Sequence, residues 1–167
     1  GNVISTGIIS AGGNVQGGNL RTVGLISATG TVTGTSFIGT ATSAQYADLA
    51  ENYLADADYE PGTVLAFGGS AEVTVASDES KRVAGIVSTH PAHLMNSHLA
   101  GEHVVALALI GRVPCKVRGS IKKGDMLVSA GDGYARPKQE PIMGTVIGKA
   151  LESSNGDNII EVVVGRS

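Results

Sequence analysis

The sequence predicts an all-β protein with a trimeric Gly-rich β-repeat shaft, a short linking helix, and an antiparallel β-barrel or sandwich head. The first part of the chain repeats itself, the charge content changes abruptly near Asp48, and the last part alternates short apolar runs with turn residues. Arg21 is the only charged side chain before Asp48, whereas all 15 carboxylates lie from there onward. We therefore expect a fibre shaft over residues 1–42, a helical connector over 43–58 and a head domain over 59–167.

The shaft prediction rests on a repeat of 17 residues. Shifting the sequence by that number pairs Gly1 with Gly18 and gives nine identities in the 20 pairs that end at Leu20 and Phe37. Gly supplies turns with positive φ between short β-prone pieces. The repeat segment has too few apolar side chains to form a core within one chain. We therefore expect three copies to pack about a shared axis as a β-helix-like homotrimer. The alternative is a disordered Gly/Ser/Thr linker, which the regular spacing of Val, Ile and Leu disfavours.

A short helix is expected over residues 43–54. The Ser43 hydroxyl can cap the free amides of a first turn, and apolar residues recur every three to four positions from Tyr46. A helix of about three turns does not persist alone in water, so it must pack on its own domain or on its copies. The predicted trimer interface comprises Val15, Leu20 and Val32 of the shaft with Tyr46, Ala50 and Tyr53 of the helix.

The head is expected to contain short strands separated by Gly, Pro, Asn and Asp turns, as in an antiparallel sandwich or barrel. The segment 61–66 resembles 123–128, and 83–87 resembles 143–147, which would suit two halves of similar plan. The expected strands are Thr63–Phe67, Glu72–Ala76, Arg82–Thr89, Val104–Ile110, Arg112–Arg118, Asp125–Ser129, Met143–Leu151 and Ile159–Val164.

An ordered series of motifs carries a resemblance to a known group of proteins. It begins with Tyr-Ala-Asp-Leu-Ala-Glu-Asn-Tyr at 46–53 and continues through 61–64, 68–69, 83–89, 94–96, 111–117, 123–125 and 144–152. The series resembles a domain common in tailed-phage structural proteins, over roughly residues 46–166. Such domains end tail fibres, tailspikes or tail-associated proteins, behind repeat shafts of this kind. A related group, the chaperone domains of phage neck appendages, guides trimerisation and then cleaves itself with carboxylates. His90 and His93 stand where Asn or Asp and an aromatic residue are expected.

Two carboxylates are candidates for such cleavage. Asp48 and Glu51 would share one face of the predicted helix. In a low dielectric one pKa would be raised, so that one group could act as acid and the other as base. The alternative is a solvated pair beside an apolar stripe. Because residue 1 is Gly, we also expect that this chain is a trimmed or processed product.

Four histidines, His90, His93, His98 and His103, fall within 14 residues. Neutral imidazoles bind metals, and three chains about an axis could present a ring of them. Their spacing matches no established zinc pattern, so an exposed loop without metal is the preferred interpretation.

A basic strand face is expected from the alternation of Arg112, Lys116 and Arg118 with apolar residues. This face could contact an acidic glycan or the acidic cluster Asp56, Asp58 and Glu60 of a neighbouring chain. An ordinary polar outer face is the simpler interpretation.

The sequence therefore predicts a non-enzymatic component of a phage tail, located in the virion and presenting a head suited to host attachment. Its expected partners are its own copies, other tail proteins and a host receptor. No cofactor is expected, because no nucleotide, hydrolase or metalloprotease motif is present. The net charge of −3 gives no case for nucleic-acid binding, and the apolar runs are too short for membrane insertion. The second hypothesis is an assembly chaperone that cleaves itself with Asp48 and Glu51.

Overall fold

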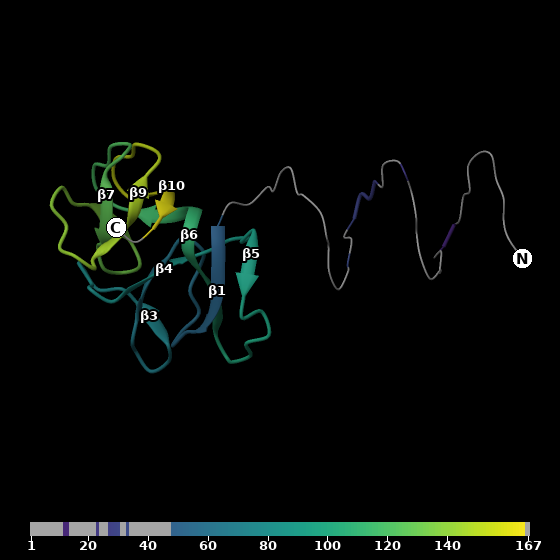
Figure 1. The fold of residues 1–167 in the computed structure, drawn as a ribbon. Helices are drawn as coiled ribbons and strands as arrows, with labels where there is room; N and C mark the ends of the chain where they lie inside the picture. Colours follow the sequence, from purple (N-terminus) through teal and green to yellow (C-terminus); the bar gives the residue numbers. More distant parts are fainter. Residues whose placement is uncertain (1–11, 14–22, 24–26, 31–32, 34–47, 166–167) are drawn as a thin grey trace, which may run out of the picture. The chain divides into compact units, whose positions relative to one another are not determined.

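The computed structural model describes residues 12–13, 23, 27–30, 33 and 48–165. The chain divides into two units, Gly1–Thr40 and Ala41–Ser167, and the fold below belongs to the second. The described residues form no helix, so this part of the chain contains no helix that could cross a membrane. The strands are β1 (Asp48–Leu54), β2 (Val64–Phe67), β3 (Val73–Val75), β4 (Val83–Val87), β5 (His93–Met95), β6 (Val104–Val117), β7 (Met126–Ser129), β8 (Ala135–Pro137), β9 (Val146–Ala150) and β10 (Asn158–Val164) (Figure 1).

The prediction of a linking helix is wrong for every residue of that segment that the structure describes. Residues 48–54 form β1, which pairs antiparallel with β6 from Asp48 opposite Gly111 to Leu54 opposite Val104. Helix propensity is a weak preference, and pairing of all seven residues with a neighbouring strand, with one register shift after Leu49, outweighs it. Residues 43–47 lie outside the described part, as do the predicted shaft residues Val15, Leu20 and Val32 and the predicted interface residue Tyr46.

The strands close into two five-stranded barrels that share β6. The first barrel contains β1, β2, β3, β4 and residues 104–110 of β6, and a parallel bridge from Ala55 to Val73 closes it. The second barrel contains residues 111–117 of β6 with β7, β8, β9 and β10, and a parallel pair from Val117 to Ala135 closes it. In Figure 1 the first barrel is blue and teal and the second is green and yellow.

The two barrels are copies of one plan. Adding 62 to the residue numbers of β1–β3 gives their counterparts in β6–β8, because the closing pair Ala55/Val73 becomes Val117/Ala135. Adding 63 converts β4 into β9, and adding 55 converts residues 104–109 into 159–164. Backbone bonds repeat in step: Gly62 N to Val87 O and Gly124 N to Ala150 O, Asp56 N to Val73 O and Arg118 N to Ala135 O, and Gly68 N to Glu72 O and Ala130 N to Tyr134 O.

The predicted likeness of the two halves is confirmed, with one error of register. The pairing of 61–66 with 123–128 is the structural one. The segment 83–87 corresponds to 146–150, however, rather than to 143–147, because Leu65 pairs with Gly85 and Leu127 with Gly148. Strong apolar similarity along both segments hides a shift of three residues.

The hydrophobic cores follow the same correspondence. The cluster inside the first barrel contains Ala55, Leu65, Val73, Ala84, Val87, Val105 and Leu107. Their counterparts all belong to the second cluster: Val117, Leu127, Ala135, Ile147, Ala150, Ile160 and Val162. That cluster also includes Val64, Ala66 and Ile86, which come from β2 and β4 of the first barrel. The two barrels therefore pack against each other, because this second cluster contains buried side chains of both.

Candidate functional site

Asp48 stands at the beginning of β1 and is buried, with 4% of its surface exposed. Its carbonyl oxygen accepts a hydrogen bond from Ala92 N at 2.9 Å, which ties the start of the strand to the loop before β5. Its carboxylate oxygen Oδ2 has no hydrogen-bond partner in the described part of the chain. A buried carboxylate oxygen without a partner is costly, so this atom needs a partner beyond the described side chains, such as water or another part of the chain.

Glu51 does not share a face with Asp48. Both residues lie in β1, where side chains three positions apart point to opposite faces. The Tyr53 hydroxyl donates a hydrogen bond to Glu51 Oε2 at 2.8 Å. The predicted carboxylate pair on one helix face is therefore wrong, because the segment is a strand.

Ala50 and Tyr53, predicted at a trimer interface, contact their own chain. Ala50 is fully buried. Tyr53 packs against the core of the first barrel, and its ring meets that of Phe67 edge to face with centroids 5.7 Å apart. The prediction that these two residues lie at a trimer interface rested on an apolar stripe of a helix, and the segment is a strand.

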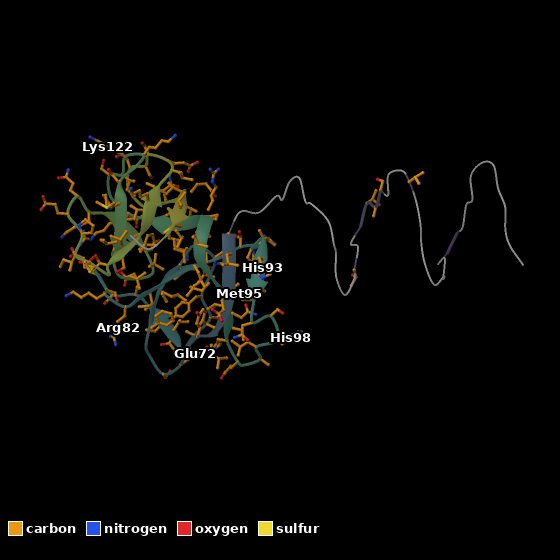
Figure 2. All side chains as sticks on the ribbon, viewed as in Figure 1. Glu72, Arg82, His93, Met95, His98 and Lys122 are labelled. Atoms are coloured by element: carbon orange, nitrogen blue, oxygen red, sulfur yellow. The ribbon has the colours of Figure 1, made fainter. Side chains whose placement is uncertain are left out.

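The four histidines are spread over the β4–β6 connection. His93 lies on β5, which pairs parallel with β1, and His98 is exposed (Figure 2). His103 Nε2 lies 4.0 Å from Glu102 Oε1. No group of three or more His, Cys, Asp or Glu residues able to hold a metal occurs within the described ranges. The structure does not bring the histidines together in one chain.

The basic strand alternates as predicted. Val113, Cys115 and Val117 are buried, and burial raises the pKa of the Cys115 thiol to about 12. The basic side chains pair within the chain. Lys116 Nζ donates to Glu60 Oε2 at 3.0 Å, Arg118 Nη1 to Asp132 Oδ2 at 3.4 Å, and Arg112 Nε lies 4.0 Å from Glu161 Oε2. Lys116 thus meets a member of the predicted acidic cluster in its own chain.

A second ionic group joins the barrels. Arg136 of β8 donates from Nε to Asp78 Oδ1 at 2.9 Å and also contacts Glu79, which accepts from Lys138 Nζ at 2.8 Å. The Arg136 guanidinium lowers the pKa of Asp78, and Lys138 followed by Arg136 lowers the pKa of Glu79. Sequence reasoning missed this group, since its members are 57 to 59 residues apart.

Sequence reasoning also missed a cavity of about 480 Å³ on the second barrel. Lysines dominate its charged lining. The lining residues are Ser120, Lys122, Gly124, Asp125, Met126, Pro137, Lys138, Gln139 and Lys149. The adjacent Lys122 and Lys123 were a visible signal, but only the barrel brings Lys138 and Lys149 beside them.

Comparison with known proteins gives a likeness of fold. No family model matches the sequence, and no curated protein matches it. The C-terminal fragment of bacteriophage phi29 gene product 12 is similar with a TM-score of 0.55 at 12% identity, covering 71% of this chain and 100% of the fragment. Pre-mature phi29 gene product 12 gives a TM-score of 0.57 at 11% identity, covering 73% of this chain and 22% of that one. The phi29 head fibre gp8.5 N base gives a TM-score of 0.48 at 20% identity, covering 71% of this chain and 94% of the N base. This chain thus matches about a fifth of pre-mature gene product 12, and its double barrel has the fold of the C-terminal fragment.

Proposed function

We propose that this protein is a structural component of a phage tail, a homotrimeric fibre or spike that presents its head domain for host attachment. The observation that carries the proposal is the double barrel, which has the fold of the phi29 gene product 12 C-terminal fragment. The 17-residue repeat before the barrel supports it, since such a repeat suits an extended shaft. The proposed partners are other copies, neighbouring tail proteins and a receptor on the host surface.

The trimer is tested by light scattering on the full chain. We expect a particle of three times the 16.8 kDa of one chain. Val15→Asp and Val32→Asp should each dissociate it, because three like charges would meet at one level of the shaft without a partner. Gln16→Asp is the matched control, since position 16 is next to Val15 and already holds a polar side chain. A monomeric parent chain would overturn the proposal.

A second candidate function is an assembly chaperone that cleaves itself next to Asp48. The observation that favours it is the buried Oδ2 of Asp48, which has no hydrogen-bond partner among residues 48–165. Because Glu51 lies on the other face of the strand, a joint role would need the two carboxylates to act from different faces or different chains.

This candidate is tested on a denaturing gel. If the chaperone function holds, Asp48→Asn and Glu51→Gln should each leave a precursor uncleaved, whereas the parent chain and Asp157→Asn are processed. Asp157 is the control because its exposed carboxylate lies in the turn before β10. Normal processing of both variants, or a parent chain without a precursor, would exclude self-cleavage.

A further inference from the structure

One surface of the first barrel is covered by a turn of the second. The β7–β8 turn places Gly133 against Thr63, and the Gly133 carbonyl accepts a hydrogen bond from Val64 N at 2.9 Å. Lys116 completes the cover, because its Nζ reaches both Glu60 Oε2 at 3.0 Å and Thr63 Oγ1 at 3.2 Å. The covered position therefore receives a glycine-rich turn and one amine.

The counterpart of this covered surface on the second barrel is the 480 Å³ cavity. Adding 62 converts Glu60, Gly62, Thr63, Val64 and Ala76 into Lys122, Gly124, Asp125, Met126 and Lys138, and adding 63 converts Ile86 into Lys149. In the first barrel, all of this set except Glu60 is buried. In the second barrel every counterpart is exposed or half-buried. The same architectural position is thus filled in one barrel and open in the other.

The open position has reversed its charge. Lys122 replaces Glu60, Lys138 and Lys149 replace the apolar Ala76 and Ile86, and Asp125 replaces Thr63. Because Lys138 already donates to Glu79 at 2.8 Å, the exposed Lys122 and Lys149 are the cations that remain for an occupant. Figure 2 shows Lys122 projecting from the second barrel. An occupant must therefore be a turn of similar shape that carries negative charge.

The first barrel of this chain has a turn of this shape, and its one carboxylate is the exposed Glu72, whose Oε2 accepts a hydrogen bond from Leu54 N at 2.7 Å. The β2–β3 turn, Gly68–Glu72, is the counterpart of the β7–β8 turn, and Gly69 and Gly131 share a positive φ of 83° and 78°. Its residues are exposed or half-buried. The barrels also differ in charge: residues 48–103 carry nine carboxylates and two Lys or Arg residues, whereas residues 104–167 carry six carboxylates and nine.

We propose that the lysine-lined cavity of the second barrel binds the β2–β3 turn of the first barrel from another copy of this chain. The contact repeats between chains the packing that the two barrels make within one chain. It is heterologous, with one turn and one cavity per chain, so copies join head to tail and can close into a ring. This proposal adds a specific contact to the homotrimer proposed above, and it depends on that proposal only for the number of copies.

The contact can be captured by cross-linking in the full chain. Gly133 is the counterpart of Ala71, and a Cβ at Gly133 would lie 3.7 Å from Val75 Cγ2, whose counterpart is Pro137. Ala71→Cys combined with Pro137→Cys should therefore form interchain disulfides or bismaleimide links. Cys115 can stay, since it is buried and burial raises its pKa to about 12.

We expect the double variant to give covalent dimers and trimers about tenfold more efficiently than either single variant, because a formed contact raises the effective thiol concentration. Ala71→Cys with Asp157→Cys is the matched control, since Asp157 is exposed and lies outside the cavity. The charge-reversal variant Lys122→Glu/Lys149→Glu should reduce the cross-linking. If light scattering shows a trimer but the Ala71/Pro137 pair links no better than the control, this contact is wrong and the trimer stands. If the parent chain is monomeric, both proposals fail.

Discussion

Gly148→Ala is expected to lower the free energy of unfolding by about 3 kcal/mol, in the upper range for overpacked cores. An added Cβ would overlap the Val163 carbonyl oxygen, and it would lie 2.9 Å from the Val163 carbonyl carbon and 3.1 Å from Val164 Cα. All three atoms belong to the β10 backbone, so no side-chain rotation can relieve the contact. Urea denaturation followed by circular dichroism measures the loss.

Two further glycines complete this test. Gly85 is the counterpart of Gly148, and its Cβ would overlap the Ala108 carbonyl oxygen, so Gly85→Ala should cause a comparable loss. Gly165 has no atom within 4 Å of an added Cβ, so Gly165→Ala should stay within about 0.5 kcal/mol of the parent chain. If Gly148→Ala behaved like Gly165→Ala, the close approach of β9 to β10 would be disproved.

Much of the head could be predicted from the sequence. Every strand expected there overlaps an observed one, because apolar runs between Gly, Pro and Asn signals are strong indicators. Strands β5 (His-Leu-Met) and β8 (Ala-Arg-Pro) were missed because they lack the β-branched residues of β3 (Val-Thr-Val), a strand of the same length that was predicted. The two strands expected on either side of Gly111 are one, β6, because Gly111 takes a positive φ of 110° without breaking the ladder.

The candidate sites were harder to predict, for two physical reasons. The sequence pattern from Asp48 to Leu54 is compatible with an amphipathic helix and with a strand. Pairing with β6, which the local sequence does not reveal, makes the segment a strand. Its secondary structure in turn fixes whether Asp48 and Glu51 can act together. The lysine-lined cavity depends on the register between the two halves, and a shift of three residues in one segment was enough to conceal that Lys149 corresponds to Ile86.

The duplication also predicts how the head unfolds. Leu65 and Leu127 are counterparts, both fully buried, one in the core of each barrel. Leu→Ala at either position removes a large buried side chain and leaves a cavity, which typically costs about 2–5 kcal/mol. Because β6 runs through both barrels and Val64 joins their cores, a loss in one barrel should destabilise the other.

Leu65→Ala and Leu127→Ala are therefore each expected to shift a single calorimetric transition of the head to lower temperature, by similar amounts. Two independent barrels would behave differently, since each substitution would move one of two transitions and leave the other in place. Leu99→Ala is the matched control: Leu99 is only half-buried in the loop after β5, so the same truncation should cost much less. A scan that resolved two transitions, each sensitive to one of the two core leucines, would show that β6 does not couple the barrels.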